Sequence, residues 1–268
     1  MSVENILADL IRIHTVNPPG GEIELAKYLK RLFDEYKIPN EIIESSPGRA
    51  SFIAYLGEGE RRLLYLSHTD VVPVTEGWSF APFSGDIKDG FVHGRGALDC
   101  KGLVAAEASA VIELARSAQL RGRLVFAAVA DEETGSTFGV KYLVEHCADR
   151  IRADFALNEG AEPPVKIGGK TCHFIGVGEK GPAWAHLQAR GVSAHGSLPM
   201  LGDNAVVKMA RAIDALAAYK PRIVLIPEVK RLIEAVARLQ GFSQDITEKN
   251  VDQVIQKIED RVYAGYLT

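Results

Sequence analysis

The chain has 268 residues, which is enough for one large domain or for one domain and part of a second. Hydrophobic residues make up 47% of it and charged residues 25%, the usual proportions of a globular protein that folds in water. The formal net charge of −4 argues against nucleic acid as the main partner, and no apolar run reaches the ~18 residues that cross a bilayer. We therefore expect no nucleic-acid partner and no membrane partner.

The first residues and the cysteines indicate where the protein is located. The start, MSVENILADLIRIH, carries acidic side chains where a secretory signal would carry basic ones. Cys100, Cys147 and Cys172 are odd in number and far apart, so they form neither a disulfide framework nor a CxxC zinc knuckle. We expect a cytoplasmic protein.

The first 160 residues alternate between helical and strand-like patterns. Apolar positions recur at helical spacing over 4–13 and 22–36, on either side of the breaker NPPGG at 17–21. Further along, apolar runs predict strands and periodic stretches predict helices: strands at 51–56, 62–67, 124–130 and 154–157, helices at 103–118 and 137–147. This alternation predicts an α/β fold with a mostly parallel sheet flanked by helices.

The pattern changes after about Gly168. Two strand-like runs, 172–178 and 183–189, precede a helical stretch at 204–219. Two more helical stripes of apolar residues follow, over 229–239 and 251–262. The second part of the chain is therefore predicted to be an α+β domain.

Two polar segments in the first part invite a chemical interpretation. His68 ends the run LLYLSH, and Asp70 lies two residues later, where a carboxylate can hold the second ring nitrogen of a histidine ligand. Asp99 lies in the glycine-rich segment HGRGALDCKG, where the backbone can turn tightly and bring a carboxylate close to a ligand. Each also fits a structural role: a histidine after a strand is often structural, and Asp99 could cap the helix that follows.

Two further strand ends carry acids. The apolar run LVFAAVA ends in Asp131, Glu132 and Glu133, and DFALNEG ends in Glu159. An acidic run on a surface is usually only solvated. Here it follows a strand of the buried type, and ligands of open α/β sheets bind at the carboxyl ends of strands.

Together these segments predict a metal centre. Six acids could meet one imidazole at a single sheet edge: Asp70, Asp99, Asp131, Glu132, Glu133 and Glu159. Carboxylates packed so closely repel one another unless cations neutralise them. An oxygen-rich set with one histidine suits a pair of divalent metals, with Zn²⁺ as the first expectation and Co²⁺ or Mn²⁺ as alternatives.

The same segments resemble the M20 family of metallopeptidases and deacylases, which includes acetylornithine deacetylase, succinyl-diaminopimelate desuccinylase, aminoacylase-1 and glutamate carboxypeptidases. The motifs that carry the resemblance follow in order: VNPPGGE, SHTDVVP, GRGALDCKG, ADEETGS, NEG and ARGVSAHGSLPMLGDNA. They cover nearly the whole chain.

The resemblance implies a role for each residue of the cluster. His68 and Glu159 would hold one metal, Glu133 the other, and Asp99 would bridge both. Asp70 would orient His68, and Glu132 would be the general base for a water that attacks an amide carbonyl. The peptide bond that follows Asp99 is expected to be cis.

The resemblance also implies a division of the chain. A catalytic metal-binding domain would cover 1–177, and a lid and dimerisation domain would cover 178–268, each of them incomplete. His195, in GVSAHGSLP, would reach from the lid into the site of the partner in a homodimer and stabilise the oxyanion. Without the resemblance, His195 is more simply an exposed loop residue.

One departure from the family pattern matters. The family's second metal takes a last histidine from a segment near the C-terminus, and no histidine follows His195 here. We therefore expect a piece of a longer polypeptide or a shortened gene product. Cys100, where the family often has Met, could be a ligand but fits a packing role better.

Three functions remain open at this point. The first is a homodimeric two-metal hydrolase of N-acyl amino acids or small peptides. The second is a scaffold or binding subunit of the same fold that lacks the last histidine ligand and does not catalyse. The third is a two-metal aminopeptidase, which would require a free α-amine on its substrate.

Overall fold

The computed structural model describes residues 2–258 apart from 118, 161–163, 177, 179–180 and 182. The chain forms two compact units, Met1–Glu159 and Gly160–Thr268. The assignment of a catalytic domain to 1–177 and a lid to 178–268 concerns function and stays a prediction. Among the described residues, no helix combines the length and the apolar character that a membrane span requires.

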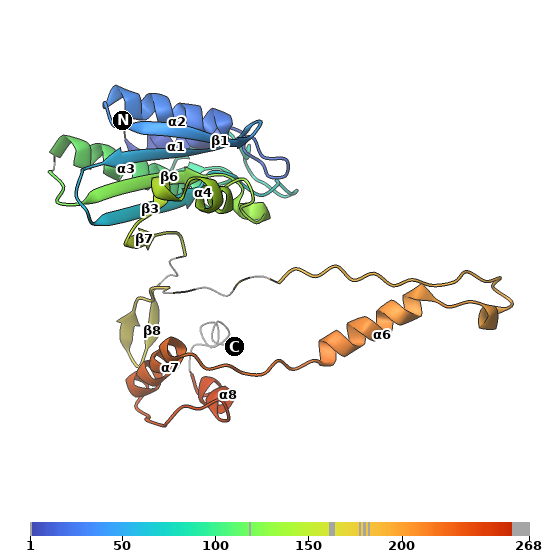
Figure 1. Cartoon of the computed structure of the whole chain (residues 1–268). Coiled ribbons are helices and arrows are strands. Elements are labelled where there is room, and N and C mark those ends of the chain that lie inside the picture. Colours follow the sequence, from blue (N-terminus) through green and yellow to red (C-terminus); the bar gives the residue numbers. More distant parts are fainter. Residues whose placement is uncertain are drawn as a thin grey trace. The chain divides into compact units, whose positions relative to one another are not determined.

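A five-stranded sheet forms the centre of the first unit (Figure 1). Its strands lie in the order β1-β2-β6-β3-β7, with bounds β1 (Asn40–Ser46), β2 (Arg49–Leu56), β6 (Arg123–Val129), β3 (Arg62–His68) and β7 (Phe155–Leu157). β3 runs parallel to both of its neighbours, β6 and β7. β1 and β2 form an antiparallel hairpin because only the turn at Pro47 and Gly48 separates them, with Gly48 at a φ of 80°.

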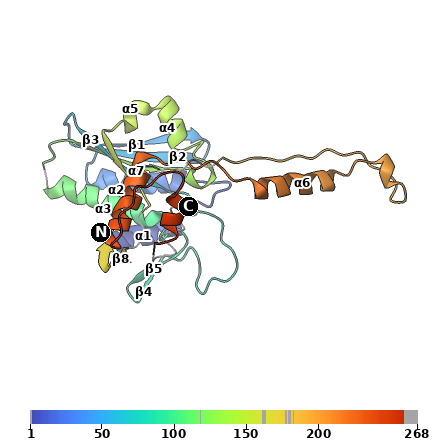
Figure 2. The ribbon, with the colours of Figure 1, turned by 90° about the horizontal axis from the view of Figure 1, so that it is seen from below.

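Helices cover both faces of this sheet. Figure 2 shows α1 (Val3–Arg12), α2 (Ile23–Glu35) and α3 (Lys101–Ser117) on one side, with α4 (Val140–His146) and α5 (Ala148–Ile151) on the other. The apolar sequence of β6 after Arg123 follows from this arrangement, because successive side chains of a strand enter opposite cores. Leu124, Phe126 and Ala128 join the core under the first three helices, and Val125, Ala127 and Val129 join the core under α4. The predicted α/β class is confirmed.

Two smaller elements of the first unit lie close to the predicted site. The hairpin of β4 (Asp86–Lys88) and β5 (Phe91–His93) precedes the loop that leads to α3. The single turn η1 (Glu132–Thr134) begins right after β6. The loop before α3 and η1 are irregular segments, which is where a rigid sheet usually presents its functional side chains.

The second unit contains the hairpin of β8 (Val165–Ile167) and β9 (Lys170–Cys172), a short turn η2 (Pro199–Leu201) and three helices, α6 (Ala205–Ala218), α7 (Pro227–Leu239) and α8 (Val251–Ile255). Ile167, Ile233 and Val254 form a small core between the hairpin, α7 and α8. In contrast, α6 buries none of its residues.

The strand predicted over 183–189 is not formed, and only Cys172 of the predicted 172–178 lies in a strand among the described residues. The physical reason is that a strand needs a neighbour for its backbone hydrogen bonds. In the described part of this region, one isolated bridge between Val192 and Asp203 is the only such pairing.

Candidate metal centre

The parallel strands bring the predicted site residues to one edge of the sheet. In the β3–β6 ladder His68 lies opposite Val129, and in the β3–β7 ladder Tyr65 lies opposite Leu157. The carboxyl ends of the three strands therefore lie side by side. The segments after them, which carry the acids predicted from the sequence, leave the sheet at the same edge.

His68 is the buried centre of the cluster, with 2% of its side chain exposed. Its Nδ1 lies 3.0 Å from the backbone oxygen of Asp70, an acceptor, so Nδ1 carries a proton. Its Nε2 faces the carboxylates, 2.9 Å from Asp99 Oδ1 and 3.4 Å from Glu159 Oε2. Asp99 is 68% exposed, so the cluster opens toward solvent on that side.

Asp70 lies beside His68, and its carboxylate also makes contacts that the sequence did not suggest. Its carboxylate is 3.5 Å from Nδ1 of His68 and fully buried. The same carboxylate accepts hydrogen bonds from the backbone N–H groups of Glu132 and Glu133, at 3.0 and 3.1 Å. Asp70 therefore fixes the turn that presents the two glutamates as well as the histidine.

The pKa values of the cluster reflect burial and the repulsion among its carboxylates. Burial raises the pKa of Glu132, with the neighbouring carboxylates adding to it and His68 opposing. Burial and the charge of Asp99 likewise raise the pKa of Glu133. Burial opposes a charged His68, but its hydrogen bonds with Asp70, Cys100 and Glu159 outweigh burial and raise its pKa. The same histidine lowers the pKa of Glu159.

Two groups of side chains in the described structure could hold a cation. His68, Asp99, Cys100 and Glu159 each offer one ligand atom within 4.8 Å of the others, and so do His68, Glu132 and Glu133. Imidazole nitrogen with carboxylate oxygens is a common donor set for zinc and for its neighbours in the transition series. Since a cation would also relieve the repulsion among the acids, the residues fit a divalent metal.

Cys100 is closely associated with the backbone of His68. The backbone N–H of His68 donates to its Sγ at 3.1 Å, and the thiol donates to the His68 oxygen at 3.3 Å. Burial raises the pKa of this thiol to about 11, so it stays protonated at neutral pH. This favours a packing role over that of a ligand. The Asp99–Cys100 peptide bond is cis, as expected.

Asp131, which we expected to join the acids, points into a separate buried network. Its backbone is left-handed, with a φ of 66°, and its carboxylate accepts hydrogen bonds from Asn17 at 3.0 Å, Arg49 at 2.8 Å and Thr134 at 2.6 Å. Arg49 also forms two hydrogen bonds with Glu22, at 2.7 and 2.8 Å. Asp131 therefore has partners of its own and does not depend on a metal.

Asn17 and Arg49 are the important residues that the sequence did not reveal. Asn17 Nδ2 donates to Asp70 at 2.8 Å as well as to Asp131 and Thr134, so it connects the two halves of the buried network. Its position in the breaker NPPGG indicated only a turn. An asparagine in a loop gives no sign that its amide is buried against two carboxylates 53 and 114 residues away.

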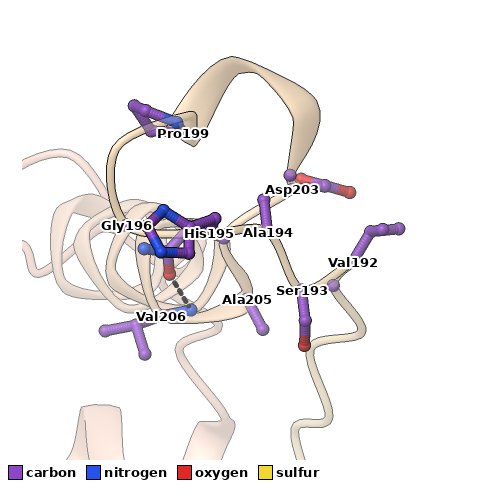
Figure 3. Close-up of a pocket in the computed structure, with 12 residues that line it drawn as sticks. Val192, Ser193, Ala194, His195, Gly196, Pro199, Asp203, Ala205 and Val206 are labelled. Carbon is purple, nitrogen blue, oxygen red and sulfur yellow. Dashed lines mark hydrogen bonds between the residues drawn. The ribbon is translucent and has the colours of Figure 1, made fainter.

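His195 lies in the second unit, in the loop between residues 191 and 206. This loop encloses a hollow of about 610 Å³, and Figure 3 shows His195, Pro199 and Asp203 around it. The backbone N–H of Ser197 donates to His195 Nδ1 at 3.2 Å, and the Ser197 hydroxyl lies 2.8 Å from the same nitrogen. In the neutral ring the proton therefore resides on Nε2. The role predicted for His195 stays a prediction.

Known proteins share this combination of sequence and fold. The profile of peptidase family M20/M25/M40 matches residues 64–255. A probable succinyl-diaminopimelate desuccinylase of Staphylococcus epidermidis is 31% identical over 268 residues, which is 98% of this chain and 60% of that protein. The succinyl-diaminopimelate desuccinylase of Acidiphilium cryptum is 34% identical over 219 residues, 78% of this chain and 54% of that protein. The chain thus spans little more than half the length of these curated relatives.

A solved structure is similar over a comparable range. The M20 family metallo-carboxypeptidase of Sulfolobus solfataricus superposes with a TM-score of 0.67 and 22% identity, over 95% of this chain and 63% of that one. At this level of identity the likeness establishes the fold.

Proposed function

We propose, from the premise that the chain belongs to peptidase family M20/M25/M40, that the protein hydrolyses amide bonds of N-acyl amino acids or small peptides with the help of divalent metals. The observation that carries this proposal is the cluster around His68, in which Asp99 and Glu159 approach one ring nitrogen at 2.9 and 3.4 Å. Acids this close together either take up protons or bind a cation, and a divalent metal would let them stay ionised.

The proposed ligands follow from the donor groups. His68, Asp99 and Glu159 would hold one metal, and Glu133 would hold a second that shares Asp99. Zn²⁺ is the first expectation, with Co²⁺ or Mn²⁺ as alternatives. When bound, such metals polarise an amide carbonyl and lower the pKa of water.

Glu132 is the proposed general base. Its pKa is raised, which brings a carboxylate closer to the proton affinity that a base needs near neutral pH. Asp70 holds its backbone through the hydrogen bond at 3.0 Å. Glu132 would take a proton from the attacking water and deliver it to the nitrogen of the departing amine.

His195 is the proposed oxyanion donor, supplied by the partner in a homodimer. The hydrogen bond from the Ser197 N–H supports this role, because it leaves the Nε2–H of the neutral ring as the free donor. The proposed dimer surface is α6, whose apolar side chains are open to solvent: Val206 is 76%, Ile213 55% and Leu216 59% exposed.

Metal analysis combined with an amidase assay tests the proposal. Glu132→Ala should leave the metal content near that of the wild type and lower kcat at least ~10²-fold. His68→Ala should lower the metal content itself. His195→Ala should slow turnover while metal binding is unchanged. Full activity of Glu132→Ala would show that the base is elsewhere.

The alternative is a protein of the same fold that binds metal without catalysis. One observation favours it: in the described structure, His68 is the only histidine in either group of potential ligands. The assay should therefore be run on this chain and on any longer product of the source gene. Two metals and turnover in the longer product alone would assign the missing donor to the added segment, and no metal in either would exclude the hydrolase.

A further inference from the structure

The first unit has a hollow beside the metal centre that the proposed chemistry does not use. It measures about 420 Å³, lies between the β4–β5 hairpin and the loop before α3, and includes Asp99 in its lining. Its walls are largely aromatic. The ring centres of Trp78 and Phe80 lie 5.3 Å apart in an edge-to-face contact, and those of Phe80 and His93 lie 4.9 Å apart. Its size is typical of small-molecule sites.

Arg95 is the cationic group in this lining. Its guanidinium lies 5.0 Å from the centre of the Trp78 ring. Its Nε is buried and has no hydrogen-bond partner, and Nη2 makes one long bond of 3.4 Å to the Pro73 oxygen. Among the described residues no carboxylate pairs with it, although an arginine carries five N–H donors in a planar fork.

We infer that this hollow is a substrate subsite, in which Arg95 binds a carboxylate that a short apolar chain separates from the amide to be cleaved. The inference rests on the proposed function. Asp99 places the hollow next to the reacting bond, the aromatic walls suit the methylene groups of the chain, and a guanidinium held against an indole ring suits bidentate binding of a carboxylate. Arg95 is therefore a specificity-determining residue.

A carboxylate of this kind can come from either side of the amide. It can end the acyl group, as in N-methylsuccinamate, or belong to the amine, as in N-acetyl-β-alanine. The experiment uses both compounds, and for each an uncharged counterpart in which a methyl group or a methylamide replaces the carboxylate. Binding to the full chain is measured by calorimetry in EDTA, so the result is independent of metal and turnover.

The variants isolate the guanidinium. Arg95→Gln should weaken binding of one of the two carboxylate compounds by about tenfold or more and leave the uncharged counterparts unaffected. Arg95→Lys should recover part of that loss, since it retains the charge without the fork. Arg116→Gln is the matched control, because Arg116 lies about 22 Å along α3 from the first turn of that helix. This variant should bind the compounds like the wild type.

A second measurement does not depend on the Arg95 variants folding. The chain has two tryptophans, and Trp184 is 96% exposed, so Trp184→Phe leaves Trp78 as the only tryptophan, whose emission can be excited selectively over that of the tyrosines. Carboxylate compounds should change its emission and uncharged counterparts should not. Two results would refute the proposed subsite: Arg95→Gln binding both carboxylate compounds like the wild type, or no change in Trp78 emission with either compound. Arg95 would then only stabilise the loop through its contact with Trp78. Loss of hydrolysis with retained binding would instead count against the proposed function alone.

Discussion

Removing the amide of Asn17 should destabilise the first unit strongly. In the part of the chain that the structure describes, Asn17 makes no hydrogen bond to a proposed metal ligand itself, and Asp70 connects it to the metal centre. The side chain is 2% exposed and donates to three acceptors, two of them carboxylates, at 2.8 to 3.0 Å. A hydrogen bond to a charged group contributes about 1.5–3 kcal/mol, and a buried acceptor left unpaired adds to the loss. Allowing for a water that fills part of the space, Asn17→Ala should lower the free energy of unfolding by about 2–4 kcal/mol.

The size of the effect can be measured by urea denaturation followed by circular dichroism, with EDTA present. Asn40→Ala is the matched control, because the Asn40 amide also donates to a carboxylate, Asp34 at 2.9 Å, in an exposed bond, and to the Ile38 oxygen at 2.8 Å. It should cost about 1 kcal/mol or less. Equal losses for the two variants would refute the reasoning, since burial would then make no difference to the contribution of the amide to the free energy of unfolding.

Asn17→Asp extends the test to charge. It replaces the donor by a third carboxylate beside Asp70 and Asp131, so it should be less stable than Asn17→Ala at pH 7. The pKa of the added carboxyl group should lie above its unfolded value of about 3.9. A raised folded-state pKa costs stability above that pKa and none below the unfolded value, so the deficit should shrink as the pH falls from 7 toward 4. A deficit that stays constant over this range would contradict the repulsion.

The remaining predictions concern two buried residues of α3 and the residue before it. Glu107 accepts a hydrogen bond from the Ser67 hydroxyl at 2.6 Å, and burial raises its pKa to about 7. Because the charged form is the unfavourable one, Glu107→Gln should stabilise the protein by about 3 kcal/mol at pH 8 and by about 1 kcal/mol or less at pH 5. Thermal unfolding at the two pH values measures this difference. Lys101 donates to the Leu10 and Ile13 oxygens at 2.9 and 2.7 Å, and burial lowers its pKa to about 7. Above pH 7 the unfolded chain therefore binds more protons than the folded one, and the stability of the wild type should rise relative to that of Lys101→Met between pH 7 and about 10. A stability difference that stays constant over this range would refute the reasoning. Cys100→Ala should lose about 1–2 kcal/mol of stability and retain the wild-type metal content, whereas a loss of metal would make the thiol a ligand.

Much of the first unit could be predicted from local pattern. Residues 124–130 form a continuous apolar run, and the structure forms β6 there over Arg123–Val129 because both sheet faces are covered. His68 is the last residue of β3, and Glu159 follows the parallel strand β7, so their meeting at Nε2 is a consequence of strand direction. The predicted strand at 183–189 failed because an extended segment depends on a neighbour that its own sequence does not specify.

The amino-acid sequence by itself determined which residues end strands and therefore which side chains could reach a common edge, because strand length and polarity are properties of consecutive residues. Only the tertiary structure decided which partner each of those side chains binds. Asp131, inside the acidic run, turns away to Asn17 and Arg49, whereas its neighbours Glu132 and Glu133 are held toward His68 by Asp70. The physical reason is that hydrogen-bond donors from far along the chain, 82 and 114 residues away, select one carboxylate among three adjacent acids.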